Sequence, residues 1–147
     1  MLDDFIETNQ ISAQILTFDE EVATCAQAKM VEKATPVVKT IVLAHSKGFA
    51  LAVVEMSKKV DISAVARILE TSAVRLSTPE EVESVTGYAV GGVPPISVYG
   101  NPTLIDEGVL SHAWVVAGGG DAKSLLKIMT KDILAHAFEA RVEKISK

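Results

Sequence analysis

The sequence predicts a mixed α/β fold in which a mostly antiparallel sheet is surrounded by helices. Two apolar, β-branched runs, 37–44 and 49–54, flank a short turn at Gly48, which is the pattern of an antiparallel hairpin. Helix start signals at Asp61 and Thr78 lie among further strand-like runs, without the regular alternation of a doubly wound parallel sheet. We therefore expect a mixed sheet rather than a parallel one.

The N-terminal part is expected to contain two helices and an edge strand. Residues 2–9 resemble a short helix, and residues 11–18 alternate partly, as in a strand at the edge of a sheet. Helical spacing of apolar residues in 20–33 favours a second helix, which contains Cys25. The hairpin that follows should be central in the sheet, because Lys39 is the only charged residue in its two runs.

Two helices in the middle of the chain have clear start signals. Asp61 is a good N-cap for a helix running through Leu69, after which 73–76 is strand-like. The sequence Thr-Pro-Glu-Glu at 78–81 combines a capping threonine, a first-turn proline and the glutamate of a capping box. Gly87 is placed to end this second helix.

The last third is expected to contain a loop, three strands and a closing helix. These are a Gly- and Pro-rich loop over 88–102, strands over 103–105, 112–117 and 123–129, and a helix over 131–144 preceded by Thr130 as its cap. A helix over 123–129 would place Lys123 and Lys127 on one face, but the alternation there favours a strand.

The composition fits one domain spanning residues 1–147. Of 147 residues, 48% are apolar and 22% charged, and no linker, repeat or low-complexity tract divides them. The longest apolar runs have about six residues, against the roughly 20 that cross a bilayer. An acidic N-terminus without the features of a secretory signal, and a single cysteine, lead us to expect a cytoplasmic location.

The charge is negative overall and unevenly distributed. A net charge of −5 argues against broad binding to a DNA or RNA backbone. Residues 1–122 contain 16 acidic and 8 basic side chains, whereas 123–147 contain 3 acidic and 6 basic. An RNA bound electrostatically would therefore contact the C-terminal segment, although a solvated, lysine-rich helix explains the same pattern.

Lys39 is the most informative single residue. A lysine inside an apolar strand must either reach solvent at an edge or point into a cleft. In the first case its stem packs on apolar surface while the ammonium reaches water. In the second case the ammonium is a fixed cationic donor for a phosphate, a ribose hydroxyl or an ester carbonyl.

Two glycine-rich segments are further candidates. In 87–95, Gly91 and Gly92 precede paired prolines, which leaves neighbouring N–H groups able to point at an anion or a carbonyl. In 117–124, three glycines permit close approach of the backbone to a ligand, but alanines at 117 and 122 exclude the phosphate-loop motif. A simple turn is the alternative for each segment, and for a Gly- and Pro-rich loop such as 87–95 it is the more common case.

Metal and covalent chemistry have little support in the sequence. The three histidines are not in metal-ligand spacing and only one cysteine is present, so a structural zinc site is not expected. No G-x-S-x-G motif occurs, and nothing marks a serine as the partner of a histidine and a carboxylate. Cys25 is expected to be a small buried apolar residue, which leaves no nucleophile for a covalent mechanism.

Six short motifs, in order, resemble the family that includes YbaK and the editing domain of prolyl-tRNA synthetase. Each motif is weak by itself, but the ordered set is specific and spans about residues 20–140. The motifs are Val38–Leu43, Val60–Ile62, Leu76–Val82, Thr86–Pro95, Leu104–Glu107 and Val116–Gly120.

The resemblance implies a sheet closed into a partial barrel and hydrolysis of an amino acid wrongly esterified to tRNA, without a metal or other cofactor. A lysine matching Lys39 lies in the pocket of such proteins, and a G-x-x-x-P loop, here Gly91–Pro95, faces the aminoacyl group. The implied site comprises Lys39, Gly91 and Gly92 for catalysis, with Thr40, Val93, Pro94, Pro95, Gly118, Gly119, Gly120 and Asp121 for substrate binding. The implied partners are the acceptor end of an aminoacyl-tRNA and, as a second candidate, prolyl-tRNA synthetase; no DNA and no membrane are implied.

The function expected from this resemblance is free-standing deacylation of a small amino acid on proline tRNA. Because the substrate is an activated ester, orienting water or a substrate hydroxyl and stabilising the oxyanion can suffice. Pro94 replaces the family's usual serine, Ile96–Ser97 replace an aromatic–glycine pair, and 98–102 extend the loop, so the amino acid is left open. A non-catalytic module that binds aminoacyl-tRNA or a nucleotide, and a structural appendage, are the alternatives.

Overall fold

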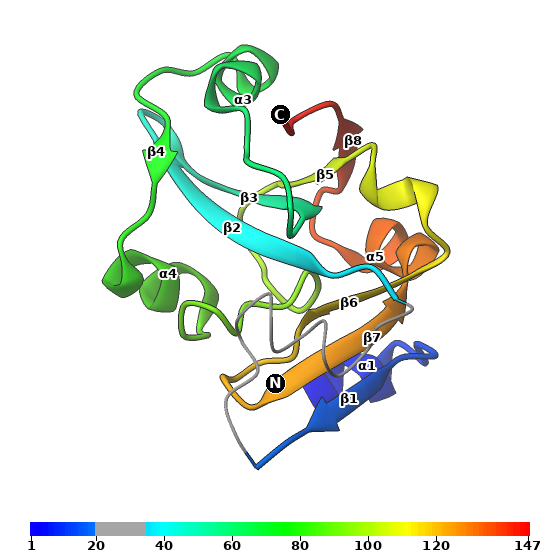
Figure 1. The fold of residues 1–147 in the computed structure, drawn as a ribbon. Coiled ribbons are helices and arrows are strands. Elements are labelled where there is room, and N and C mark those ends of the chain that lie inside the picture. Colours follow the sequence, from blue (N-terminus) through cyan, green and yellow to red (C-terminus); the bar gives the residue numbers. More distant parts are fainter. Residues whose placement is uncertain (20–34) are drawn as a thin grey trace.

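The computed structural model describes residues 1–19 and 35–147, which form two β-sheets with helices around them (Figure 1). One sheet has the strand order β1-β7-β6 and the other the order β4-β2-β3-β5-β8. None of the described helices is long and apolar enough to span a membrane. In chain order the described elements are α1 (Leu2–Thr8), β1 (Gln14–Thr17), β2 (Val38–His45), β3 (Gly48–Glu55), α3 (Ile62–Leu69), β4 (Arg75–Leu76), α4 (Pro79–Thr86), β5 (Thr103–Asp106), the 3-10 turn η1 (Val109–Ser111), β6 (Trp114–Gly118), β7 (Ser124–Met129), α5 (Thr130–His136) and β8 (Arg141–Glu143).

The prediction of a mixed, mostly antiparallel fold is confirmed. The β1–β7, β6–β7, β2–β3 and β2–β4 pairs are antiparallel, whereas the β3–β5 and β5–β8 pairs are parallel. The predicted hairpin is β2 and β3, and it lies in the middle of the larger sheet. The helix expected over 20–33, with Cys25, falls outside the described residues.

The two sheets meet at the start of β2 but do not close into the expected barrel. Val37 forms an isolated parallel bridge with Val116 of β6, and the Val116 N–H donates to the Pro36 carbonyl at 2.9 Å. On its other side the Val37 carbonyl accepts from the Met56 N–H at 2.8 Å. The chain therefore passes from one sheet into the other at this point.

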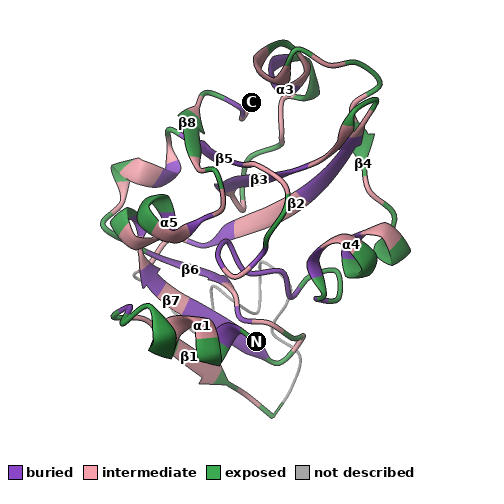
Figure 2. Ribbon diagram, turned by 180° about the vertical axis from the view of Figure 1, so that it is seen from behind, coloured by how far each residue is buried: buried purple, intermediate pink, exposed green. Residues whose placement is uncertain are grey.

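Alternating side chains of the hairpin supply two apolar clusters, one on each face of the larger sheet. Val42 and Leu51 belong to the main core, to which both sheets contribute. Leu43 and Val54 point the opposite way and pack with Val65 of α3. Figure 2 shows this burial along β2, β3 and β7. Coverage of both faces explains why both runs of the hairpin are almost continuously apolar.

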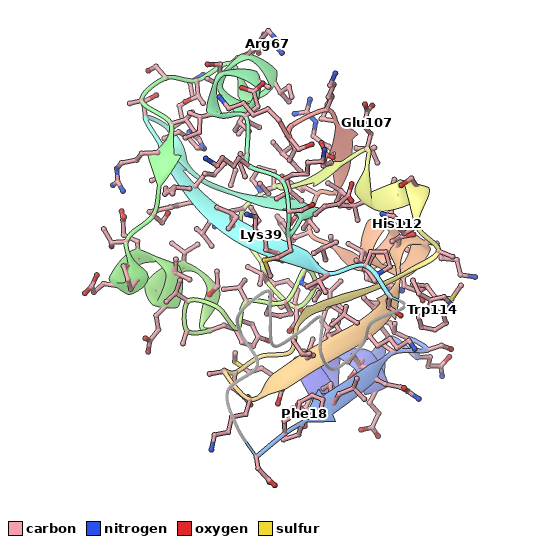
Figure 3. The ribbon with its side chains drawn as sticks, viewed as in Figure 1. Phe18, Lys39, Arg67, Glu107, His112 and Trp114 are labelled. Atoms are coloured by element: carbon pink, nitrogen blue, oxygen red, sulfur yellow. The ribbon has the colours of Figure 1, made fainter. Side chains whose placement is uncertain are left out.

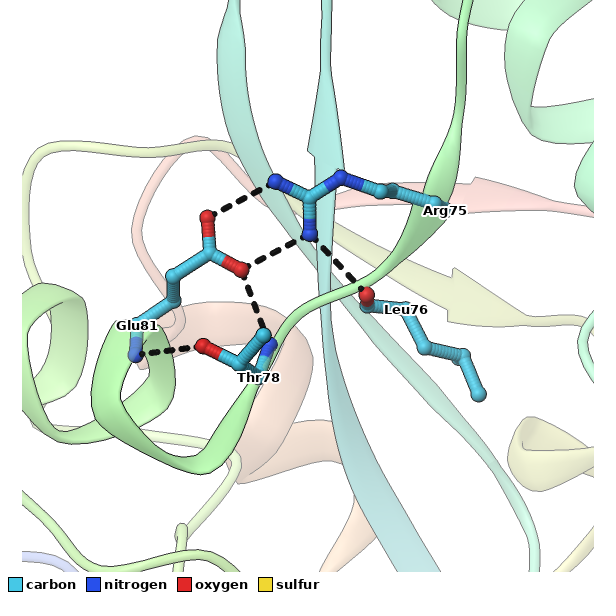
Figure 4. Close-up of polar contacts among 4 residues, drawn as sticks. All are labelled: Arg75, Leu76, Thr78 and Glu81. Atoms are coloured by element: carbon cyan, nitrogen blue, oxygen red, sulfur yellow. Dashed lines mark hydrogen bonds and ion pairs between the residues drawn. The ribbon is translucent and has the colours of Figure 1, made fainter.

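Two of the three predicted N-caps form, at Asp61 and Thr78. Asp61 accepts a hydrogen bond from the Ala64 N–H at 3.1 Å at the start of α3. At α4, Thr78 Oγ1 accepts from the Glu81 N–H at 3.2 Å, while Glu81 Oε1 accepts from the Thr78 N–H at 2.8 Å (Figure 4). Gly87 ends α4 in the left-handed conformation, with φ of 79°.

Glu81 also ties α4 to the short strand β4. The guanidinium of Arg75 donates to both carboxylate oxygens of Glu81, at 2.7 and 2.9 Å, and to the Leu76 carbonyl at 3.2 Å (Figure 4). The hydrogen bonds from Arg75 and from the Thr78 N–H lower the pKa of Glu81 from 4.5 to about 2. The segment between β4 and α4 is thereby held in one conformation.

The helix expected over 131–144 is wrong beyond its first two turns. The helix α5 ends at His136, and Arg141–Glu143 forms β8, which pairs in parallel with β5. The chain becomes extended at Ala137, and the Phe138 carbonyl accepts from the N–H of the first residue of β5 at 3.1 Å. Pairing with a distant strand thus replaces the local helical pattern.

The expected cap of α5 is also wrong. Thr130 is the first residue of the helix, and no side chain caps it. Its hydroxyl instead donates to the His112 carbonyl at 2.6 Å, and its N–H donates to the Ala113 carbonyl at 3.0 Å. Thr130 therefore anchors the segment that enters β6.

Asp106 holds the C-terminal tail against the larger sheet. Its side chain is 2% exposed and accepts from the N–H groups of Ile145 and Ser146 at 2.9 and 3.0 Å. It also accepts from the Ser146 hydroxyl at 3.0 Å and from the Gly108 N–H at 3.1 Å. Four hydrogen bonds compensate for burying this carboxylate.

We expect Glu81→Gln to destabilise the protein at neutral pH but not in strong acid. Because the pKa of Glu81 is lowered on folding, its stabilisation is present above about 4.5 and is lost as the pH falls toward about 2. Thermal unfolding at a series of pH values should show a gap between Glu81→Gln and the parent chain that closes over this range. Glu80→Gln is the matched control; a gap independent of pH would contradict this account.

We expect Asp106→Ala to lower the free energy of unfolding by about 2–4 kcal/mol, because four donors lose their acceptor in a buried place. Denaturant unfolding measures the loss, with Glu107→Ala, an exposed neighbour, as the control. Hydrogen exchange at the amides of Ile145 and Ser146 should also accelerate. Equal stability of the two variants would show that Asp106 does not anchor the tail.

Candidate functional site

A pocket of about 320 Å³ opens beside β2, between the two sheets. Its walls are formed by Val37–Val42, by Leu76 and Ser77 after β4, by Val82 of α4, and by Val90, Gly91 and Val93 of the long loop; Met56, Leu125 and the end of β6 complete it. Figure 3 labels Lys39, the second residue of β2, on the strand that contributes most of the lining. We call this cavity the Lys39 pocket.

In the described part of the chain, one edge of β2 is paired only at its ends, which leaves room for the pocket. His45 and Gly48 close a two-residue hairpin turn, so alternate residues of β2 pair with β3 and the others point away from it. On that outer edge Pro36 bonds to β6 and Val42 accepts from the Ser77 N–H at 3.0 Å. The bridge between Val37 and Val116 also engages the Val38 N–H, so Thr40 is the residue whose N–H and C=O lie on this edge between the two anchors.

Lys39 and Thr40 reach this pocket from opposite faces of β2. Lys39 lies opposite Val54 and Thr40 opposite Val53, so their side chains leave the strand in opposite directions. Both line the pocket because it opens along the strand edge. Within the described residues, the ammonium of Lys39 has no hydrogen-bonding or ion-pair partner. Of the two alternatives for Lys39, the cleft lysine fits this position.

Two hydroxyl groups in the pocket wall lack a partner. Thr40 Oγ1 and Ser77 Oγ are buried, and neither forms a hydrogen bond within the described part of the chain. Ser77 lies beside Val42, whose side chain is on the same face of β2 as that of Thr40, so the two hydroxyls are diagonal neighbours. Buried polar groups without partners are costly, and a ligand that hydrogen-bonds them removes this cost.

The sequence did not point to Ser77. Its position in the pocket depends on the pairing of β4 with β2, which brings together residues more than thirty positions apart. Residues 76–82 contain a family motif and a helix start signal, and both signals are local. Ser77 is a polar residue directly before the capping box, which is a signal in the sequence. That signal indicates a pocket residue only when the pairing of β4 with β2 is also known.

The glycines of the two loops bring their backbones close to each other. The Gly120 N–H donates to the Gly92 carbonyl at 2.9 Å. A Cβ atom on Gly118 would overlap the Val93 carbonyl, and one on Gly92 would lie 3.0 Å from the backbone of Asp121. The sequence predicted that these glycines let the backbone approach a ligand closely. In the structure, at least some of them instead let the two loops pack on each other.

The predicted site residues divide into two groups. Lys39, Thr40, Gly91, Val93 and Gly118 line the Lys39 pocket. The remaining six do not line it: Gly92, Pro94, Pro95, Gly119, Gly120 and Asp121.

The residues Gly119, Gly120 and Asp121 face a separate groove of about 550 Å³, beside Met1 and Tyr88, which we call the Asp121 groove. The Asp121 carboxylate accepts from the Lys123 N–H at 2.8 Å, which shapes the turn before β7.

The loop that faces the pocket is fixed from behind by Tyr88. This residue is 4% exposed, its hydroxyl donates to Ser97 Oγ at 3.0 Å, and its N–H donates to Thr86 Oγ1 at 3.0 Å. Burial raises the pKa of the Tyr88 hydroxyl, so this group stays protonated at neutral pH. Ser97, which accepts the hydrogen bond from the Tyr88 hydroxyl, has a left-handed backbone conformation with φ of 67°.

The Lys39 pocket offers polar groups for a small ester within apolar walls. The cation of Lys39 and the backbone donors of β2 can hold a carbonyl oxygen, while backbone acceptors can hold an ammonium group. No group of three or more histidine, cysteine, aspartate or glutamate residues that could bind a metal ion is found among residues 1–19 and 35–147. Positioning and electrostatic stabilisation are the chemistry that this arrangement supplies.

Comparison with known proteins indicates the family of this chain. A protein-family model described as the aminoacyl-tRNA editing domain matches residues 19–135. The crystal structure of a proposed trans-editing enzyme for prolyl tRNA synthetase is similar, with a TM-score of 0.89 and 28% identity over 99% of this chain and 94% of that one.

Two further solved structures are similar. A hypothetical protein designated APE2540 has a TM-score of 0.87 and 25% identity, over 99% of both chains. A signal transduction protein from Marinobacter aquaeolei shares the fold alone, with a TM-score of 0.70 and 16% identity over 99% of this chain and 30% of that one.

These findings support an aminoacyl-tRNA deacylase type of function at the level of the family. The family model covers most of the chain, including β2, α4, the long loop and β6, which together form the Lys39 pocket. The YbaK-like fold expected from the sequence motifs is confirmed by the same matches. The chain belongs to the aminoacyl-tRNA editing domain family.

Proposed function

We propose that residues 1–147 act as a single, free-standing domain that hydrolyses a small amino acid from mischarged proline tRNA. The observation that carries this proposal is the Lys39 pocket at the open edge of β2, where the Lys39 ammonium and the hydroxyls of Thr40 and Ser77 have no partner among residues 1–19 and 35–147. The family match supports the reaction class, and the similarity to a proposed trans-editing enzyme for prolyl tRNA synthetase supports this tRNA. The synthetase itself is a further proposed partner.

In the proposed reaction, water adds to the ester carbonyl and the bond to the ribose oxygen breaks. The products are a free amino acid and an uncharged tRNA whose ribose hydroxyl has regained its proton. Lys39 and the N–H groups facing the pocket stabilise the negative charge that develops on the carbonyl oxygen. Since an aminoacyl ester is already activated, alignment of the water and this stabilisation account for catalysis without a protein nucleophile.

Selection for a small amino acid follows from the pocket walls. Val38, Val42, Val82 and Val93 surround the space with buried apolar side chains. A packed wall excludes a larger side chain strongly, whereas a smaller one loses only about 1–3 kcal/mol for each missing methylene. Alanine, serine and cysteine are the candidates that we propose.

We expect Lys39→Ala to reduce deacylation by at least about tenfold, roughly 1.4 kcal/mol of transition-state stabilisation, while the fold stays intact. The assay measures release of alanine, serine and cysteine from proline tRNA by the purified proteins. Lys58→Ala, at an exposed lysine in the turn after β3, is the matched control. Unchanged release by Lys39→Ala would remove this residue from the mechanism.

We expect Thr40→Val to lower kcat/KM by roughly five- to tenfold, the effect of one hydrogen bond to the substrate. Stability should not fall, because the variant removes a buried hydroxyl without a partner and keeps a side chain of similar size. Thermal unfolding and deacylation are measured side by side, with exposed Thr8→Val as the control. A drop in stability without loss of activity would show a structural role instead.

A further inference from the structure

A second, larger cavity of about 830 Å³ lies beside the start of β6 and the end of β7. It has no role in the reaction described above. Its wall includes Trp114, which is 37% exposed and labelled in Figure 3, together with the side chains of Gln14, His112 and Lys127. We call it the Trp114 cavity. A half-exposed tryptophan beside polar and cationic groups is unusual for a surface that only meets water.

The wall that carries Trp114 is fixed in place. Thr130 anchors His112 and Ala113, the two residues before Trp114. Its hydroxyl donates to the His112 carbonyl, and its N–H donates to the Ala113 carbonyl. The His112 ring lies 3.5 Å from the Glu55 carboxylate at the end of β3. Trp114 itself is in register with Met129 on β7. The indole is therefore presented by a rigid platform, as a binding surface requires.

The Trp114 cavity adjoins the Lys39 pocket. Thr35 and Pro36 line the first, and Val37 and Val38 line the second, so consecutive residues of one segment border both cavities. Lys39 follows Pro36 by three residue steps of extended chain, a distance of about 10 Å. A ligand longer than an aminoacyl-ribose can thus occupy both places.

A nucleotide suits the chemistry of this cavity. A nucleobase stacks on the face of an exposed indole, and such stacking tolerates any base. Of the described residues that line the cavity, Lys127 is basic. The hydroxyl, amide and imidazole groups of the wall can hydrogen-bond base edges or a ribose.

We propose that the Trp114 cavity binds the penultimate nucleotide of the tRNA 3′ end, with its base stacked on Trp114, while the terminal aminoacyl-adenosine occupies the Lys39 pocket. This proposal rests on the proposed function for the identity of the RNA. It adds a second binding site and sets the direction of the strand, from the Trp114 cavity past Pro36 to Lys39. A single-stranded end can reach both sites without melting the acceptor helix.

The direct test uses the fluorescence of Trp114, the only tryptophan in the chain. The uncharged RNA trinucleotide CCA should quench its emission in a saturable way. The same trinucleotide with an abasic middle residue keeps the phosphates and should quench far less. Absence of quenching by CCA, or equal quenching by both probes, would overturn the proposal.

A kinetic test uses minihelix substrates ending in CCA. Trp114→Ala should raise KM at least about fivefold, the loss of one base–aromatic stack, and should change kcat much less. Trp114→Phe should restore most of the affinity, and Tyr99→Ala, at a 64% exposed aromatic residue elsewhere, is the control. A KM for Trp114→Ala equal to that of Tyr99→Ala would overturn the proposal.

These experiments distinguish a failure of the proposed deacylation from a failure of the proposed nucleotide site in the Trp114 cavity. Quenching by uncharged CCA needs no turnover, so a protein that binds but does not deacylate would still support the Trp114 cavity. Deacylation with an unaltered KM in Trp114→Ala would retain the proposed function and remove the second site. Thermal unfolding of Trp114→Phe and Trp114→Ala shows whether either variant has lost its fold.

Discussion

Strand β2 has a continuous partner on one side but partners on the other side only at its two ends, and the site depends on this arrangement. The hairpin with β3 uses the polar groups of one edge along its whole length. The other edge pairs with β6 near Val37 and with β4 near Leu43. Backbone groups between these points would be costly to bury without partners, so the edge remains open to a cavity that a polar ligand can enter.

The apolar clusters keep this edge in place. Side chains of β2 and β3 are buried on both faces, so a slip of β2 by one residue would move Lys39 to the opposite face of the sheet, into the main apolar cluster. The ion pair of Arg75 with Glu81 and the capping box fix the segment that brings Ser77 to the pocket. The Gly92 and Gly118 loops, packed on each other, fix the opposite wall. Rigid elements thus surround a site whose polar groups are already oriented.

Local signals were enough to predict much of the fold. The hairpin, the caps at Asp61 and Thr78 and the loop over 88–102 follow from residues that act on their near neighbours. The C-terminal region could not be predicted in this way, because Arg141–Glu143 is a strand only by pairing with β5 and the tail is held by Asp106, nearly forty residues earlier. Burial of a carboxylate with four donors leaves no local pattern.

The type of site could be predicted from the sequence, but the set of residues that line it could not. An isolated lysine in an apolar strand indicated Lys39, and motif order indicated the two glycine-rich loops. Which loop residues reach the cavity depends on how the loops pack, and this packing turns Gly119, Gly120 and Asp121 toward the Asp121 groove. Ser77 and Trp114 acquire their places from strand pairing alone, and neither has a distinctive sequence context.

The central claim is that an aminoacyl-adenosine binds at the open edge of β2, and amide chemical shifts test it most directly. The probe is adenosine carrying alanine through a non-hydrolysable 3′ amide, titrated into the isotopically labelled protein. The account predicts that the amides of Val38, Thr40, Ser77, Gly91 and Gly118 shift together, with weaker binding in Lys39→Ala. Shifts confined to Gly119, Gly120 and Asp121 would place the ligand in the Asp121 groove and contradict it.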